Sequence, residues 1–226
     1  GNKAKEKALS GQGSGFVLGY DSKTYLQVAN ERFPKSNVIY SEDPSSKEIA
    51  SADLILLFAG FKHEGEGSNR SFVVDEDAMI TRCVSENMNT IVCVVTGGGI
   101  EMNWADDAAA IIQAFYGGQT GAEVLMDILT GKVNPSGKLA FTIENKFEDS
   151  PSYLAEQKRK PNPELGFKPE EFPMDYGLMK IEDRPGELFA FDDVYSEGIL
   201  MGYRWYDAKK RAVRFPFGLG LSYTTF

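Results

Sequence analysis

Three largely apolar runs, separated by segments of helical pattern, constrain the fold of this chain more than any other feature. The runs are LILLFA (Leu54–Ala59), TIVCVV (Thr90–Val95) and AAIIQAFY (Ala109–Tyr116). A strand that is apolar at successive positions is typical of a parallel sheet with helices on both faces, because neither side of the strand meets water. We therefore expect an α/β fold with a mostly parallel sheet, in which Leu54–Ala59 is a central strand.

The segments around the runs carry helix signals. Ser45–Glu48 (SSKE) and Thr120–Glu123 (TGAE) have the pattern of a capping box, which satisfies free backbone N–H groups at a helix start. The sequence also predicts a helix over Asp75–Asn87, and weaker strands at Asn37–Tyr40 and Lys138–Ile143. Strands that alternate with crossover helices favour a three-layer αβα sandwich.

Two further features belong to this pattern. An early helix is expected after Ser22 as N-cap, and Gly131 stands where a glycine commonly ends a helix. The apolar face of the early helix would consist of Tyr25, Leu26, Ala29 and Phe33.

Composition excludes several functions. The 226 residues carry a formal net charge of −9, which argues against nucleic acid or an anionic membrane as a partner. No run approaches the roughly 20 apolar residues of a membrane span. Cys83 and Cys93 fall in apolar segments and are expected in the core, and no Cys/His/Asp cluster has the spacing of a metal site. We expect no metal and no cofactor.

The stretch from about residue 145 to residue 193 differs from the rest. It is polar, has little periodicity and contains Pro151, Pro161, Pro163, Pro169, Pro173 and Pro185. The pattern indicates an irregular, Pro-rich excursion near the C-terminus. A lid, an arm that docks on another domain and a homodimer contact are all open as its role.

The segment that follows the first apolar run is KHEGEGSNR, Lys62–Arg70. Glu64 and Glu66 are each followed by glycine, and loops that follow parallel strands lie where α/β proteins bind ligands. A carboxyl group that is partly desolvated there has a raised pKa and can donate a proton near neutral pH. On residue types alone, a solvated acidic turn is the commoner explanation.

Other motifs are weaker indicators of function. Gly11–Gly15 (GQGSG) lacks the preceding strand and the following Gly-Lys-Ser/Thr of a phosphate loop, so a tight loop is expected. His63 is the only histidine, and no G-x-S-x-G elbow accompanies it. The aromatic motifs GYRWYD and FPFG suggest sugar stacking, but such clusters are more often core or interface.

Taken together, the motifs resemble the C-terminal αβα-sandwich domain of family 3 glycoside hydrolases, the β-glucosidase and β-xylosidase group. They occur in the family's order over nearly the whole chain: GQGSG, EGEGSNR, VVTGGGIEMNW, AFYGGQTGAEVLMDILTGKVNPSGKLAFTI, YSEGILMGYRWYD and FPFGLGLSYTTF. The resemblance implies that residues 1–226 are one such domain. It also implies that the chain is a fragment, since these enzymes place an (α/β)8 barrel before this domain.

The resemblance assigns the chemistry. The barrel supplies an aspartate nucleophile, and the family loop pattern Glu-Gly-x-Asp-Arg matches Glu66–Arg70, with Asn69 in place of the aspartate. Glu66 then takes the general acid/base role, Glu64 is the second choice, and Arg70 positions the loop. The implied activity is that of a retaining, exo-acting β-glycosidase, with β-glucosidase as the leading candidate, and the implied partners are a glycoside or oligosaccharide and the barrel.

A second hypothesis gives the chain a non-enzymatic function. The chain can be a non-catalytic sugar-binding or structural module derived from such an enzyme, which Asn69 favours and Glu66 disfavours. In either case the isolated chain is expected to be inactive, with an exposed apolar face where the barrel docks. Relatives occur in several compartments, and a periplasmic or secreted location is somewhat favoured over the cytoplasm.

Overall fold

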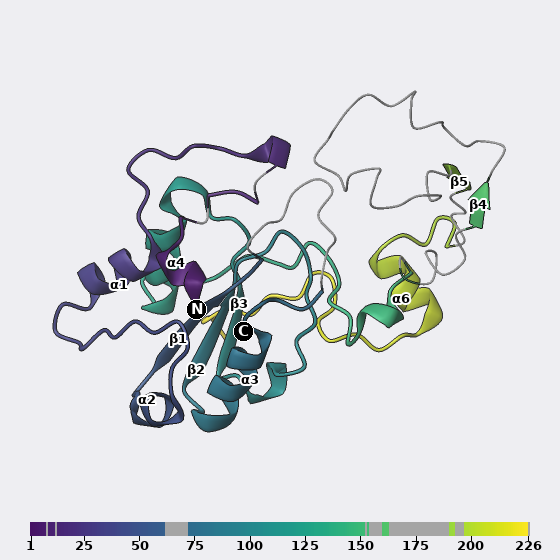
Figure 1. Cartoon of the computed structure of the whole chain (residues 1–226). Coiled ribbons are helices and arrows are strands. Elements are labelled where there is room, and N and C mark those ends of the chain that lie inside the picture. The colour runs from purple at the N-terminus through teal and green to yellow at the C-terminus, as the bar shows by residue number, and fades with distance from the viewer. Residues whose placement is uncertain are drawn as a thin grey trace.

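The computed structural model describes residues 1–7, 9–11, 13–61, 72–151, 153, 160–162, 190–192 and 197–225. Its centre is a sheet of parallel strands in the order β1 (Ile55–Ala59), β2 (Thr90–Val94), β3 (Ala110–Gln113). Ile55 is in register with Thr90, and Ile91 with Ala110 (Figure 1). The expected α/β fold with a parallel sheet is confirmed.

Helices cover both faces of this sheet and make three layers (Figure 1). On one face, α2 (Ser46–Ser51) and α3 (Asp77–Glu86) pack on Leu57, Ala59, Val92 and Val94. On the other face, α1 (Tyr25–Arg32) and α4 (Gly121–Leu129) pack on Phe58, Cys93 and Val95. Successive strand residues therefore enter opposite apolar clusters, which explains why the runs are apolar at nearly every position.

Helix starts follow local hydrogen bonding. The capping box at Ser45 is confirmed: the backbone N–H of Ser45 donates to Glu48 Oε2 (2.7 Å). Thr24, not Ser22, caps α1, and its hydroxyl accepts from the backbone N–H of Gln27 (3.2 Å). Thr120 makes no side-chain cap, because a 3-10 turn over Gly118–Thr120 leads into α4 and Thr120 lacks the extended backbone of an N-cap.

Helix ends and helix lengths agree with the expectation in most respects. Gly131 follows α4 with φ +72°, a left-handed conformation that favours glycine. The helix expected over Asp75–Asn87 is α3, with Ile80, Cys83 and Val84 buried.

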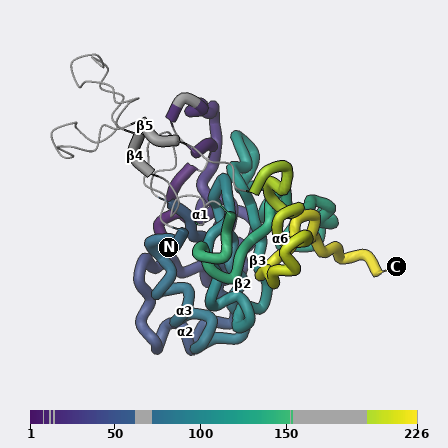
Figure 2. Tube along the Cα trace, turned by 90° about the vertical axis from the view of Figure 1, so that its right-hand side faces the viewer, coloured from purple at the N-terminus to yellow at the C-terminus, as the bar shows by residue number. Residues whose placement is uncertain are grey.

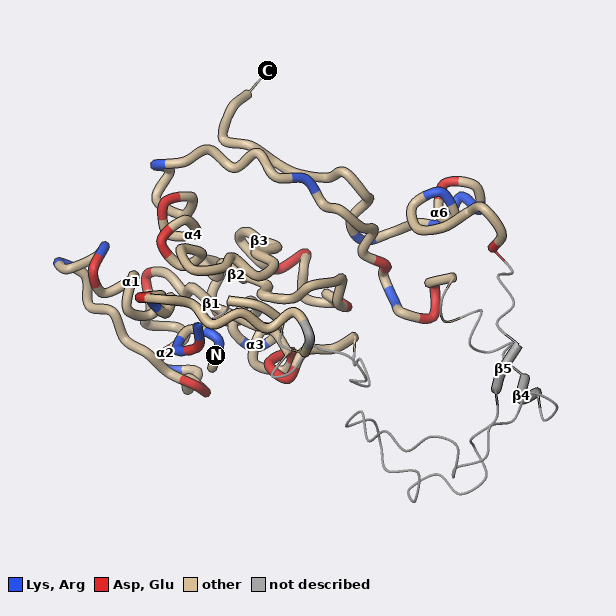
Figure 3. The backbone as a smooth tube through the Cα atoms, turned by 90° about the horizontal axis from the view of Figure 1, so that it is seen from above, with Lys and Arg blue, Asp and Glu red and all other residues tan. Residues whose placement is uncertain are grey.

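Three expectations about strands are wrong in detail. In the described sheet β1 is an edge strand and β2 is central. Asn37–Tyr40 forms no strand. Lys138–Ile143 does not join the sheet, because its hydrogen bonds go to the C-terminal segment: Leu139 N–H to Leu219 O (2.8 Å) and Ile143 N–H to Phe215 O (2.8 Å). Figure 3 shows these two segments side by side.

The remaining elements lie toward the C-terminus. β4 (Lys160–Asn162) and β5 (Ala190–Asp192) pair antiparallel within the Pro-rich stretch, most of which lies outside the described residues. α6 (Tyr203–Lys209) follows, and the chain then runs along the Lys138–Ile143 segment to a C-terminus that stands away from the sheet (Figure 2). None of the helices in the described part is long and apolar enough to cross a membrane.

Both cysteines are free and buried, as expected. Burial raises the pKa of the Cys93 thiol to about 12, so this thiol stays protonated and unreactive at neutral pH.

The substitution Ile80→Ala tests the packing between α3 and the sheet. Ile80 is completely buried in the cluster under α2 and α3. Its truncation leaves a cavity and should lower the free energy of unfolding by about 2–4 kcal/mol, as measured by urea denaturation. Ser85→Ala on the exposed side of the same helix is the control and should change stability by less than about 0.5 kcal/mol. Equal effects of the two substitutions would contradict this packing.

Candidate active site

The carboxyl ends of β1, β2 and β3 meet at one edge of the sheet because the strands are parallel. The loops that follow them span residues 60–76, 95–109 and 114–120. The predicted site residues Glu64, Glu66 and Arg70 lie in the first loop, at positions outside the described residues. What the structure does describe is how both ends of that loop are attached.

The upstream end of the loop is held against the end of β2. Gly60 follows β1, and its N–H donates to Glu76 Oε2 (3.4 Å) at the start of α3. A Cβ atom at position 60 would lie 2.2 Å from the carbonyl oxygen of Val95, so only glycine allows this approach. Burial is the main cause that raises the pKa of Glu76, partly offset by the Gly60 N–H. The loop therefore leaves the sheet at a fixed point.

The downstream end is held by Glu101 from the loop after β2. The backbone N–H of Glu101 donates to the Phe72 carbonyl oxygen (2.7 Å), and Glu101 Oε1 accepts from the Phe147 N–H (2.9 Å). The rings of Phe72 and Phe147 stack with centroids 3.6 Å apart, and Tyr153 meets Phe147 edge-on at 5.4 Å. Through its backbone N–H and its side chain, Glu101 thus joins three segments that are distant in sequence.

The loop after β2 is also braced from within. Trp104 is buried, and its indole N–H donates to Asp77 Oδ1 (3.0 Å) on the first turn of α3. Gln113 at the end of β3 donates to the Thr96 carbonyl oxygen (3.0 Å) and to the Thr96 hydroxyl (3.1 Å). These bonds tie the ends of β2 and β3 together and fix the wall of the loop that contacts Phe72.

The loop after β3 turns tightly into α4. A Cβ atom on Gly117 would lie 2.6 Å from the Gly121 Cα, and Gly118 has φ +66°, so both positions favour glycine. The Gln119 Oε1 atom accepts from the Tyr20 N–H (3.4 Å). The N-terminal segment around Tyr20 therefore lies beside the same edge of the sheet.

Sequence reasoning did not identify Glu101 or Gln113 as bracing residues, although both lie in glycine-rich loops or at a strand end. Their partners are backbone groups of other loops, and no local pattern indicates such contacts. The described carboxylates near the edge, Glu76 and Glu101, accept hydrogen bonds from backbone N–H groups and so are structural. Among the described residues, no group of three or more His, Cys, Asp or Glu could hold a metal ion.

Comparison with known proteins identifies the family. The model of the glycosyl hydrolase family 3 C-terminal domain matches residues 1–223. The chain belongs to this family.

Curated relatives of the chain are named β-glucosidases. The chain is 30% identical over 227 residues to β-glucosidase BoGH3A of Bacteroides ovatus, which covers 97% of the chain and 27% of that relative. It is 31% identical over 221 residues to thermostable β-glucosidase B of Acetivibrio thermocellus, covering 89% of the chain and 25% of that relative. The chain therefore spans about a quarter of the length of these relatives.

Solved structures share the fold. The family 3 β-glucosidase of Bifidobacterium adolescentis matches with a TM-score of 0.67 at 26% identity, over 95% of this chain and 30% of that one. The β-glucosidase of Kluyveromyces marxianus, solved with glucose, matches with a TM-score of 0.60 at 30% identity, over 80% of this chain and 19% of that one.

The substitution Gly60→Ala tests the fixed exit of the first loop. A methyl group would collide with the Val95 carbonyl, so the end of β1 must shift, at a cost of about 1–3 kcal/mol in unfolding free energy. Gly121→Ala is the matched control, since a Cβ there meets nothing within 4 Å; it should be neutral or stabilise by up to about 1 kcal/mol. The free energy of unfolding of both variants is measured by denaturant titration. A Gly60→Ala protein as stable as Gly121→Ala would contradict the close approach of Gly60 to the Val95 carbonyl oxygen.

Proposed function

We propose that this domain supplies the general acid/base of a retaining β-glycosidase, with β-glucosidase as the activity, and that Glu66 is the residue. The observation that carries the proposal is the origin of its loop, which leaves β1 at the carboxyl edge of a family 3 C-terminal domain. Relatives that carry this domain are named β-glucosidases. Glu66, Glu64 and Arg70 keep the roles that the family pattern gives them: acid/base, second choice and loop positioning.

Retaining hydrolysis needs two carboxyl groups about 5–5.5 Å apart. One attacks the anomeric carbon, while the other protonates the departing oxygen and then removes a proton from water. In this proposal an (α/β)8 barrel of the same protein provides the attacking aspartate, and the sandwich domain provides the second carboxyl group. Glycines beside Glu66 let the carboxyl group approach the sugar, while the braced ends at Gly60 and Phe72 keep the loop at the edge of the sheet.

Exposed apolar side chains support docking of another domain at this edge. Phe16, Val17, Leu18 and Tyr20 are 57%, 60%, 77% and 79% exposed, and Tyr20 contacts Gln119 of the loop after β3. Neighbouring apolar side chains that stay exposed together mark interaction surfaces. A barrel placed here would cover them and would bring its pocket to the first loop.

Glu66→Gln in the full-length enzyme is the direct test, with Glu64→Gln two residues away as the matched control. An unactivated disaccharide needs the acid, so kcat/KM should fall by about 10²–10⁴ in Glu66→Gln. An aryl glycoside with a good leaving group needs little protonation, so its burst of aryl release should survive while steady turnover slows. Added azide, which attacks without a general base, should then restore turnover.

The outcomes separate the hypotheses. The same pattern in Glu64→Gln instead of Glu66→Gln would move the role by two residues and contradict the assignment. Wild-type kinetics in both variants would favour the sugar-binding or structural module, for which the Asn69 substitution is the supporting observation.

The isolated chain gives a second prediction. Without an attacking carboxylate the purified 226-residue chain should not hydrolyse an aryl β-glucoside, because only half of the carboxyl pair is present. Release of the aryl group is measured by absorbance at high protein concentration, with Glu66→Gln as the control for contamination. Turnover by the chain that disappears in Glu66→Gln would contradict the division of the active site between two domains.

A further inference from the structure

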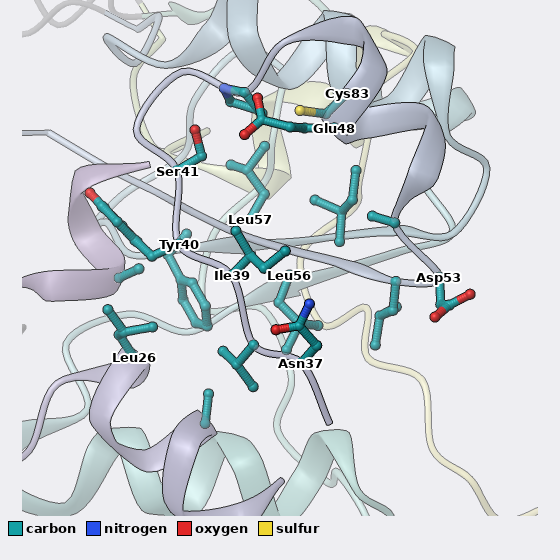
Figure 4. A pocket seen from close by; sticks show the side chains of 18 of the residues that line it. Leu26, Asn37, Ile39, Tyr40, Ser41, Glu48, Asp53, Leu56, Leu57 and Cys83 are labelled. Carbon is teal, nitrogen blue, oxygen red and sulfur yellow. The ribbon is translucent and has the colours of Figure 1, made fainter. Parts of the chain in front are cut away.

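The described contacts of the loop that carries the proposed acid/base lie at its two ends. A cavity of about 770 Å³ lies elsewhere, beside β1, and Leu26, Leu56 and Leu57 are among the side chains that line it (Figure 4). No described residue of the three loops at the carboxyl edge lines this cavity. In the described part of the chain, the position of the loop therefore depends on the residues that hold its ends, and Glu101 holds the downstream one.

The backbone of Glu101 is fixed by its neighbours. Ile100 and Met102 are each only 2% exposed and pack in the cluster under α2 and α3. Trp104 is buried in the same cluster, and its indole N–H donates to Asp77 Oδ1 (3.0 Å). Glu101 itself is half-buried, and its carboxyl group extends from this rigid base to a different segment of the chain.

The carboxyl group of Glu101 holds the first residue of a short turn. Its Oε1 atom accepts from the Phe147 N–H (2.9 Å), where the 3-10 turn over Phe147–Asp149 begins. The first N–H groups of such a turn have no partner within it, so a carboxylate acceptor is favourable there. The turn closes with a bond from the Ser150 N–H to the Phe147 carbonyl oxygen (2.9 Å). Glu101 thereby fixes the place of Phe147 relative to the loop after β2.

Phe147 transmits this position to the downstream end of the first loop. Its ring stacks on the Phe72 ring, with centroids 3.6 Å apart and an angle of 16° between the planes. Val74, two residues further, is 2% exposed and enters the core cluster under α2 and α3. Phe72 is thus held by its ring and, through its carbonyl oxygen, by the Glu101 N–H (2.7 Å). Loss of the Glu101 carboxyl group would leave Phe147 free to move and would weaken the hold on the ring.

We infer that Glu101 is a positioning residue for the acid/base: through Phe147 it holds Phe72, and so fixes the downstream end of the loop that carries Glu66. The inference rests on the proposed function, because it takes Glu66 as the group that protonates the departing oxygen. A general acid acts only within hydrogen-bonding reach of that oxygen, and a misplacement of about 1 Å can cost about a hundredfold in rate. Glu66 precedes Phe72 by only six residues, so a loosened Phe72 leaves the acid less often in a productive position.

Variants of the full-length enzyme test this role. Glu101→Ala removes the acceptor, and Glu101→Asp keeps the charge but is one methylene too short to reach the Phe147 N–H. Glu101→Gln keeps an acceptor oxygen at the same reach. Glu148→Ala is the matched control, since Glu148 is an exposed carboxylate next to Phe147 in the same turn. kcat/KM is measured on an unactivated disaccharide, which needs the acid, and the burst of aryl release on a glycoside with a good leaving group, which needs little protonation.

Glu101→Ala and Glu101→Asp should lower kcat/KM on the disaccharide about 10- to 100-fold and should leave the aryl burst within about threefold of wild type. Glu101→Gln should restore the disaccharide activity, and Glu148→Ala should not change it. Added to Glu66→Gln, the Glu101→Ala change should cost less than about threefold more, because the group that it positions is already gone. Should Glu101→Ala fail to fold, as judged from its Tm, the comparison of Glu101→Asp with Glu101→Gln makes the same test.

Equal losses on the two substrates would overturn the proposal, since a general loss of structure does not depend on the leaving group. So would an undiminished effect of Glu101→Ala in the Glu66→Gln protein, or a Glu101→Gln enzyme as slow as Glu101→Ala. A leaving-group dependence in Glu66→Gln without one in Glu101→Ala would overturn this inference alone. Wild-type kinetics in Glu66→Gln would instead refute the proposed function, and this inference with it.

Discussion

The parallel pairing of β1 with β2 is the interaction on which the rest of the structure depends. Its register sends Leu57 and Val92 into the cluster under α2 and α3, and sends Phe58 and Cys93 into the cluster under α1 and α4. A shift by one residue would exchange the two sets and bring each against the wrong helices. The same pairing brings the carboxyl ends of the strands to one edge and forces Gly60 against Val95, so the position of the candidate loop follows from it.

The edge of the sheet combines fixed ends with a glycine-rich middle. Gly60 is held by β2 and α3, and Phe72 by Glu101 and the Phe147 ring. A catalytic carboxyl group must be held to within about 0.5 Å of its working position, which requires rigid support around it. In the proposed function, the glycines beside Glu66 supply the reach that a residue from one domain needs to act on a sugar bound by another.

The sequence predicted the features that depend on neighbouring residues and missed the contacts between residues that are distant along the chain. The apolar runs predicted the strands, and Ser45 with Glu48 predicted the start of a helix, because each of these signals lies within a few residues of the structure that it indicates. The strand expected at Lys138–Ile143 failed because its partner, near Phe215, is some seventy residues away along the chain. The sequence also missed the hydrogen bond from Trp104 to Asp77 and the hydrogen bonds of Glu101, because these too join residues that are distant along the chain. The acid/base role proposed for Glu66 rests on the family pattern, since a carboxylate in a loop does not by itself distinguish a catalytic acid from a solvated acidic turn.

The edge position of β1 in the described sheet bears on the loop that begins at Gly60. Strand edges open more readily than internal strands, because fewer hydrogen bonds and apolar contacts must break. Phe58, near the end of β1, lies only two residues before Gly60, where the loop begins. The stiffness of the loop's upstream end therefore depends on two hydrogen bonds, from the Gly60 N–H to Glu76 and from the Val95 N–H to the Ala59 carbonyl oxygen.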